Sequence, residues 1–225
     1  MKYSEVVKTG ICGYGSTAIC YLLDDNRVFK EFAKPLPGAC ADNYRHLINL
    51  HNKSFRFPVE FVFDDTNNFC GYIMGYANGL TLRSTFKSSD LNKMSINTIS
   101  FENEIKNVSK KGIKFRDFHS DNIIYNNEFI VVDTDSFIKS DEDTDLLIYE
   151  NVTYYKDVLY NLFTENLNRF KYSDCILDKS KEYMALKHIT SGEMIYNVLN
   201  LLKNKYKDSS IKSINDIDES YKKRK

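Results

Sequence analysis

FRDFHSDNIIYNNEFIVVDTDSF, residues 115–137, is the most informative segment of the chain. Asp117 and Asn122 lie in a polar loop, two short strand-like runs follow, and Asp133 comes directly after the second run. A carboxylate such as Asp117 can accept the proton of a hydroxyl group. Asn122 and Asp133 offer hard oxygen ligands of the type that Mg²⁺ takes together with phosphates. A capped surface loop explains any one of these residues, but their order and spacing favour a site that handles phosphate groups.

A glycine-containing turn lies near the start of the chain, between two strand-like runs. Gly13 and Gly15 are followed by Ser16 and Ala18. Glycine lets backbone N–H groups approach phosphate oxygens because it has no Cβ. Alone, the cluster predicts only a turn, since no Gly-Lys-Ser/Thr follows it as in a P-loop.

Lys30 lies on the next strand-like run, across a predicted hairpin from the glycine turn. An isolated strand lysine is usually an edge or surface residue. Here the hairpin would bring its ammonium group to the place where the phosphates of a bound ligand would lie. The glycine turn and Lys30 together therefore indicate the same chemistry as residues 115–137.

Residue patterns predict a strand-rich first third and a helical remainder. We expect strands within 17–32, 57–63 and 68–77, a break at the prolines of 34–40, and a helix over 39–52. Further helices are expected over 91–111, 154–170, 181–206 and 213–223. The expected buried face of the helix over 91–111 consists of Ile96, Ile99, Ile105 and Val108. A domain boundary is expected near Gly75 to Asn78.

Composition excludes several classes of protein. Lys plus Arg and Asp plus Glu both number 31, so bulk charge indicates no nucleic-acid partner. The five cysteines form no CxxC pair, which argues against a disulfide scaffold and a cysteine zinc site. Neither a signal-peptide core nor a long apolar run is apparent. We therefore expect no membrane partner and a cytoplasmic location, with delivery into a host cell left open.

These motifs occur in the order found in the protein-kinase-like superfamily, which the chain resembles over most of its length. It is most similar to compact bacterial or phage-type Ser/Thr kinases. The matching segments are the glycine turn with Ala18 in the third glycine position, Lys30, Phe115-Arg116-Asp117 in place of His-Arg-Asp, Asn122, and Asp133-Thr134-Asp135 in place of Asp-Phe-Gly. The resemblance implies a two-lobed α+β fold, with a small antiparallel sheet lobe over 1–76 and a helical lobe over 77–225.

The resemblance also implies a role for each matching residue. ATP would bind with its adenine near Met74, Tyr76 and Ala77, and with its phosphates under the turn formed by Gly13, Gly15, Ser16 and Ala18. Lys30 would reach the phosphates, Asn122 and Asp133 would hold Mg²⁺, and Asp117 would orient the acceptor hydroxyl. Asp157, within Tyr155-Lys156-Asp157, resembles the aspartate that anchors the catalytic loop.

Several positions depart from the protein-kinase pattern. Residues 39–52 contain no Glu to pair with Lys30, so Asp42 is the expected partner, with Asn43 as an alternative occupant. His119 and Asp135 resemble instead the aminoglycoside- and choline-type phosphotransferases. The segment after Asp135 is too short for the usual peptide platform.

Three functions remain open at this point. An ATP- and Mg²⁺-dependent protein Ser/Thr kinase is favoured over a small-molecule kinase of the aminoglycoside or choline type. A pseudokinase acting as a nucleotide-binding interaction module is the third. The acidic stretch with Asp141, Glu142, Asp143, Asp145 and Glu150 favours a basic protein acceptor and activity without loop phosphorylation. The oligomeric state is left open.

Overall fold

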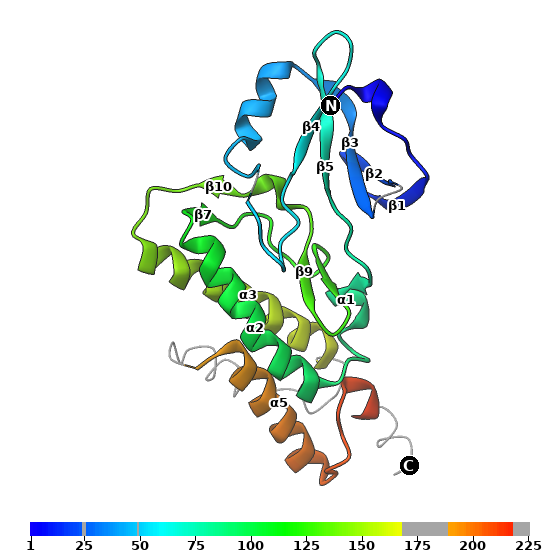
Figure 1. Ribbon diagram of the computed structural model, residues 1–225. Coiled ribbons are helices and arrows are strands. Elements are labelled where there is room, and N and C mark those ends of the chain that lie inside the picture. Colours follow the sequence, from blue (N-terminus) through cyan, green and yellow to red (C-terminus); the bar gives the residue numbers. More distant parts are fainter. Residues whose placement is uncertain (24–25, 49, 168–188, 218–225) are drawn as a thin grey trace. The chain divides into compact units, whose positions relative to one another are not determined.

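The computed structural model describes residues 1–23, 26–48, 50–167 and 189–217, which form two compact units (Figure 1). Unit 1 comprises Met1–Asn78 and Ile130–Lys139. Unit 2 comprises Gly79–Phe129 and the described residues from Ser140 onward. The N-terminal part is an antiparallel sheet and the C-terminal part is helical, which confirms the expected α+β class.

Unit 1 is built on a five-stranded sheet in the order β1-β2-β3-β5-β4, with every neighbouring pair antiparallel. The strands are β1 (Gly10–Tyr14), β2 (Ala18–Leu22), β3 (Arg27–Leu36), β4 (Glu60–Phe63) and β5 (Phe69–Gly75). A short 3₁₀ helix, η1 (Tyr3–Glu5), precedes them. The hairpins expected within 17–32 and across 64–68 are confirmed.

Alternation along β3 gives the sheet two apolar faces, as a period of two requires. Val28 packs in a cluster with Tyr72 and Met74, whereas its neighbour Phe29 packs with Val62 and Ile73. β3 continues through Pro35, where a break was expected. Pro35 is tolerated because the pairing of β3 with β5 is irregular between Glu31 and Leu36.

The prediction of a helix over residues 39–52 is wrong in both the type and the length of the helix. The segment instead forms a 3₁₀ helix, η2 (Gly38–Tyr44), followed by turns. Its bonds span three residues, as in Arg45 N–H to Asp42 O and Leu47 N–H to Tyr44 O. Asp42 and Asn43 favour such turns because their side chains compete for backbone groups. Leu47 is the fully buried residue of the segment.

The segment Ile130–Lys139 belongs to unit 1 through backbone bonds to residues 54–56. Val131 N–H donates to Ser54 O at 2.7 Å, and Arg56 N–H donates to Val131 O at 2.9 Å. The segment contains the end of β9 (Phe129–Val131), a 3₁₀ turn η3 (Thr134–Ser136) and β10 (Ile138–Lys139). Asp133 and Asp135 are therefore part of the same unit as Lys30.

Unit 2 is mainly helical (Figure 1). Its helices are α1 (Leu82–Thr85), α2 (Leu91–Ser109), α3 (Thr144–Leu167) and α5 (Ser191–Tyr206). Its strands are β6 (Leu80–Thr81), β7 (Ile113–Lys114) and β8 (Ile123–Tyr125). β6 pairs antiparallel with β8, which fixes the start of unit 2 beside the end of the loop that carries Asp117.

Helix α2 confirms the helix expected over 91–111 but corrects half of its buried face. Ile105 and Val108 are buried, whereas Ile96 and Ile99 are exposed. The buried stripe is set by Met94, Thr98, Phe101, Ile105 and Val108, spaced three or four residues apart. Asp90 caps the helix by accepting hydrogen bonds from Asn92 N–H and Lys93 N–H.

Helix α3 begins ten residues earlier than the expected helix over 154–170. Asp143 supplies the start signal, since its carboxylate accepts from the N–H groups of Asp145 and Leu146. Of the helix expected over 181–206, α5 covers the part from Ser191, and residues 181–188 lie outside the described residues. Residues 214–217 are helical, and the rest of the stretch predicted to 223 lies outside.

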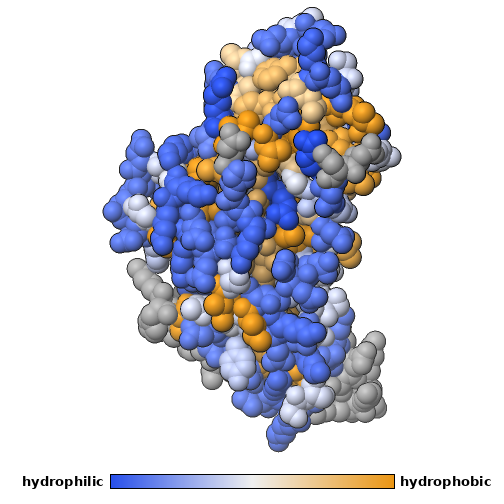
Figure 2. All heavy atoms as spheres, viewed as in Figure 1, coloured by the Kyte–Doolittle hydropathy of each residue, from blue (hydrophilic) through white to orange (hydrophobic). Residues whose placement is uncertain are grey.

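Hydrophilic residues cover most of the face of unit 2 that Figure 2 presents. Among the helices in the described ranges, none combines the length and the apolar character needed to cross a bilayer.

Candidate functional site

The glycine turn joins β1 to β2 in unit 1. Gly15 N–H donates to Ala18 O at 2.8 Å, and Gly13 lies opposite Cys20. A Cβ added at Gly13 or Gly15 would meet nothing closer than 3.5 Å. Ala18 is buried and Ser16 is exposed. The fold of unit 1 therefore does not itself demand glycine at these two positions, and the space above the turn is open.

The residues expected near an adenine ring lie at the end of β5. Met74 is buried and pairs with Val28. Tyr76 N–H donates to Asn26 O at 3.1 Å, and Arg56 Nε donates to Tyr76 O at 3.2 Å. Ala77 follows and is half-buried. This edge of unit 1 is thus held by backbone bonds.

Lys30 lies on β3 and contacts two carboxylates of its own unit. Its Nζ donates to Asp133 Oδ1 and lies 3.0 Å from each carboxylate oxygen of Asp135. The Lys30 side chain is 9% exposed, that of Asp135 17% and that of Asp133 40%. The ring of Tyr72 lies 5.7 Å from the same ammonium nitrogen. Lys30, Asp133 and Asp135 thus form one charged cluster, of which Asp133 is the most accessible member.

The turn that presents both carboxylates is anchored on each side. Asp133 has a left-handed backbone with φ of 60°, which Asp tolerates better than most residues. The Thr134 hydroxyl donates to Arg56 O at 3.1 Å, and Phe137 packs against Phe55 and Phe57. His46 Nε2 lies 2.8 Å from the carbonyl oxygen of Phe137. The position of Asp133 and Asp135 is therefore fixed by packing within unit 1.

Burial sets the protonation behaviour of this cluster. It raises the pKa of Asp135 to about 6, with Asp133 adding to the rise and the Lys30 ammonium opposing it. Burial alone would lower the pKa of Lys30, but attraction to Asp135 and Asp133 outweighs it and the pKa is raised. At neutral pH the cluster is a Lys30 cation between two carboxylates.

Asp42 was expected to pair with Lys30, and this is wrong. Asp42 is exposed and its carboxylate pairs with Arg45, three residues further along at the C-cap of η2. The pairing fails because residues 39–52 do not form the helix that would aim a side chain at β3. Asn43, the alternative occupant, is also exposed.

In unit 2, Asp117 and Asn122 lie in the loop between β7 and β8. Asn122 Nδ2 donates to the carbonyl oxygen of Asp117 at 3.0 Å, and Asn122 N–H donates to His119 O at 3.0 Å. Because the side-chain nitrogen of Asn122 donates this hydrogen bond, its side-chain oxygen is the atom that can bind a cation. Asp117 is exposed and left-handed, with φ of 51°. An uncommon backbone conformation at an exposed acid is a pattern that accompanies functional sites.

Asn151 of α3 anchors this loop, a role that the sequence led us to expect for Asp157. Asn151 Oδ1 accepts from Phe115 N–H at 3.0 Å, and its Nδ2 donates to Ser109 Oγ and Ile113 O at 2.9 and 2.8 Å. Asp157 is exposed. Motif spacing identified the helix but not the residue, since α3 starts earlier than expected.

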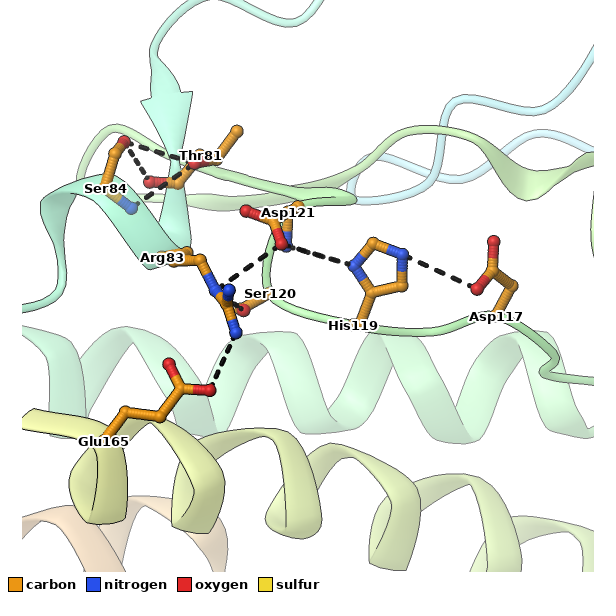
Figure 3. Close-up of polar contacts among 8 residues, drawn as sticks. All are labelled: Thr81, Arg83, Ser84, Asp117, His119, Ser120, Asp121 and Glu165. Atoms are coloured by element: carbon orange, nitrogen blue, oxygen red, sulfur yellow. Dashed lines mark hydrogen bonds and ion pairs between the residues drawn. The ribbon is translucent and has the colours of Figure 1, made fainter. Parts of the chain in front are cut away.

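A chain of polar contacts runs along the loop to Asp117 (Figure 3). Arg83 lies 2.7 Å from Glu165 and 3.5 Å from Asp121. His119 Nδ1 lies 3.8 Å from the Asp121 carboxylate, and its Nε2 lies 3.5 Å from Asp117 Oδ1. Arg83 and Asp121 were not singled out from the sequence, and only the pattern of the loop around His119 pointed to this region.

Both units contain a pocket within the described residues. One of about 170 Å³, in unit 2, is lined by His119, Ser120, Arg83, Asp157 and Glu165 among others. A larger one of about 370 Å³, in unit 1, lies against Tyr3 and Cys70 and includes none of the candidate site residues. The smaller pocket is therefore the better candidate for a part of the site, because residues of the loop that carries Asp117 line it.

The acidic segment after β10 is shorter than the sequence suggested. Asp145 and Glu150 lie in α3, and Asp143 caps it. Lys114 pairs with both Glu142 and Glu150 at 2.7 Å. Part of the acidic charge is thus neutralised within unit 2.

Each unit contains an oxygen donor of the type that Mg²⁺ takes in proteins. No group of three or more His, Cys, Asp or Glu side chains suited to a metal occurs in the described ranges. Mg²⁺ does not need one, since it keeps several waters and takes one or two carboxylates together with substrate phosphates. Asp133, partly exposed beside a cation, and Asn122, with a free amide oxygen, are donors of this kind.

The structure brings some of the predicted site residues together. In unit 1 they are Lys30 and Asp133, and in unit 2 they are Asp117 and Asn122. The roles that require residues of both units remain predictions.

Comparisons with known proteins bear on the fold. No family model matches the sequence, and no curated protein matches it. The structure is similar to that of the GRMZM2G135359 pseudokinase in its apo form, with a TM-score of 0.60 and 14% sequence identity, over 89% of this chain and 95% of that one. At this level of identity the likeness concerns the fold. The chain therefore has a protein-kinase-like fold.

Proposed function

We propose that the protein is an ATP- and Mg²⁺-dependent phosphotransferase that transfers the γ-phosphate of ATP to a hydroxyl group of a protein. Asp117 would act on the acceptor, and Lys30 would contact the phosphates. Asn122 and Asp133 would hold the metal, which would neutralise phosphate charge when bound.

One observation supports the proposal most: within each unit, residues predicted for the site contact one another. Lys30 is buried and paired with Asp133 in unit 1, and Asn122 is bonded to the backbone of Asp117 in unit 2. Asp117 and Asp133 both have positive φ. Uncommon backbone conformations of this kind often accompany functional residues, although Asn26, Asn67, Asn127 and Lys207 also have positive φ.

The glycine turn between β1 and β2 gives independent support for phosphate binding. Neither Gly13 nor Gly15 is required by crowding within unit 1. A ligand that approaches the backbone closely would explain glycine at both positions, because a Cβ would occupy the space of that ligand. Phosphate oxygens are ligands of that kind.

In the proposed reaction the acceptor oxygen forms a bond to the γ-phosphorus while the bond from that phosphorus to the bridging oxygen of ADP breaks. The hydroxyl proton passes to Asp117. The chain's own contribution is to hold these groups in line and to supply positive charge.

A basic protein acceptor is favoured by the charges of unit 2. The pocket beside His119 is lined by Asp157 and Glu165, and Arg83 is the cationic residue of its lining. Arg83 is already paired with Glu165. Asp141 adds an exposed carboxylate in the segment before α3. Acidic surfaces of this kind attract basic partners, an effect that salt weakens.

A pseudokinase that binds nucleotide without transferring phosphate is the second candidate. The observation that favours it is the absence of a helix glutamate near Lys30, together with the ion pair between Lys30 and Asp133. The fold is also that of a protein described as a pseudokinase. Retention of Asp117, Asn122 and Asp133 together favours the active enzyme.

Thermal unfolding with ATP, in the presence and absence of Mg²⁺, tests the binding half of the proposal. Ligand at 100 times its Kd stabilises a fold by about 2.7 kcal/mol. We expect ATP with Mg²⁺ to raise the melting temperature of the wild type, and Asp133→Asn to remove the Mg²⁺ dependence. Asp65→Asn, in an exposed turn of unit 1, is the matched control. A wild type that melts alike with and without Mg²⁺ would contradict the metal assignment.

A further inference from the structure

We propose that Asp135 positions Lys30 for phosphate binding, in the place of the helix glutamate that this chain lacks. The inference rests on the proposed function and assigns to it a residue that the sequence analysis did not include among the site residues. Glycine, which has no side chain, is the residue that the kinase resemblance leads one to expect at this position. The resemblance therefore does not explain why position 135 carries a carboxylate.

The geometry joins Asp135 to Lys30 more fully than it joins any other described acid. Both oxygens of Asp135 lie 3.0 Å from the Lys30 nitrogen. Asp133 contacts the same nitrogen through one oxygen. Asp42 is exposed and pairs with Arg45. Two equal contacts restrict an ammonium group that would otherwise rotate on a flexible stem.

The two carboxylates differ in exposure, and this suggests a division of roles. The side chain of Asp133 is 40% exposed, whereas that of Asp135 is 17% exposed. If Asp133 turned to another cation, a Lys30 without Asp135 would be a buried charge with no partner, which is strongly unfavourable. With Asp135 in place, Lys30 would stay paired if Asp133 turned to another cation.

The backbone holds Asp135 in place independently of Lys30. It lies in the middle of η3, where Phe137 N–H donates to Thr134 O at 3.1 Å. Thr134 is fully buried and its hydroxyl is bonded to Arg56 O. Asp135 thus acts as a fixed support for Lys30 and not as a side chain that follows it.

A double-mutant cycle with Lys30→Met and Asp135→Asn tests the assignment. ATP affinity in the presence of Mg²⁺ and unfolding in urea without nucleotide are measured for the wild type, both single variants and the double variant. We expect Asp135→Asn alone to raise the Kd for ATP about 10-fold, the loss expected for a charged hydrogen-bond partner. In the Lys30→Met background it should add almost nothing. The control Asp42→Asn should leave affinity and unfolding unchanged.

The outcomes separate this inference from the proposed function. A wild type that binds no ATP overturns the proposed function and, with it, any role of Asp135 in that function. A wild type that binds ATP, with effects of the two substitutions that simply add, overturns the Asp135 inference alone. If Asp135→Asn does not fold, the double variant decides. Folding restored by Lys30→Met supports the pairing, and continued unfolding contradicts it.

Discussion

Nε2 of His119 lies 3.5 Å from Oδ1 of Asp117, the candidate acceptor-binding acid (Figure 3). The backbone N–H of Asp121 donates to Nδ1 of the same ring at 3.3 Å. An accepting Nδ1 places the proton of a neutral imidazole on Nε2, so that an N–H group faces the carboxylate. We therefore expect His119 to help orient Asp117 from within the same loop.

His119→Ala should lower turnover about 10- to 100-fold, because a small displacement of a catalytic group has effects of this size. The affinity for ATP should stay near that of the wild type, since His119 is assigned to the acceptor side. Steady-state kinetics with varied ATP, alongside direct ATP binding, give both values. His51→Ala, an exposed histidine of unit 1, is the control. Equal loss of ATP affinity and turnover would argue that His119 only supports the fold.

Asn151→Ala should destabilise unit 2 by about 2–6 kcal/mol. The substitution leaves the buried N–H of Phe115 and the carbonyl of Ile113 without a partner, and each such loss costs about 1–3 kcal/mol. Chemical denaturation gives the change in the free energy of unfolding. Asn161→Ala, exposed on the same helix, should change it by less than about 0.5 kcal/mol. Similar values for both variants would remove Asn151 from its anchoring role.

Glu102 should make stability depend on acid pH through the contact between α2 and α5. Burial raises the pKa of Glu102, but the hydrogen bond from Ser191 N–H and the ion pair with Lys106 outweigh it, and the pKa falls below its ordinary value of 4.5. A depressed carboxylate pKa contributes stability above the unfolded value, and that contribution is lost as pH falls through the folded value.

The difference in unfolding free energy between the wild type and Glu102→Gln should therefore be largest above about pH 5 and shrink toward lower pH. Urea unfolding at a series of pH values measures it. Asn103→Ala, which removes an exposed side chain without a titratable group from the same helix, is the control and should show a difference that does not change with pH. A difference for Glu102→Gln that grows as pH falls would contradict the assignment.

Gly192→Ala should destabilise the packing of α5 on α2. A Cβ at position 192 would lie 2.5 Å from the carbonyl oxygen of Ser95, a backbone atom that cannot move aside cheaply. Overpacking of this kind costs about 1–3 kcal/mol. Gly10→Ala, where an added Cβ meets no atom within 4 Å, is the matched control. Thermal melts of the two variants should separate clearly, and coincident melts would contradict the packing argument.

Strands β2 to β5 of unit 1 and helix α2 could be predicted from sequence because their apolar residues repeat with periods near two and 3.6. Strand β1 was missed because its glycines, Gly10 and Gly13, are typical of a loop. The helix predicted over residues 39–52 was wrong. Tyr44 and Leu47 have the spacing of a helical face, whereas Asp42 and Asn43 favour turns. Helix α3 was placed too late because its cap, Asp143, lies in an acidic stretch that reads as a loop.

Lys30, Asp117, Asn122 and Asp133 were selected from their order and spacing and from the resemblance to protein kinases, and their roles remain predictions. The partner of Lys30 could not be predicted, because pairing between residues about 100 positions apart depends on how Ile130–Lys139 joins unit 1. Asn151 was missed for the same reason, since an asparagine in a helix carries no local signal of its distant contacts.

Transfer of labelled phosphate from γ-labelled ATP tests the central claim most directly. The wild type, Asp117→Asn and the control Asp65→Asn are incubated with Mg²⁺, a basic protein and a panel of hydroxylated small molecules. The proposed function predicts label on protein from the wild type and Asp65→Asn. Asp117→Asn should lose about 10²–10⁴-fold of the rate while still binding ATP. Undiminished transfer by Asp117→Asn, or label on no acceptor at all from the wild type, would contradict it.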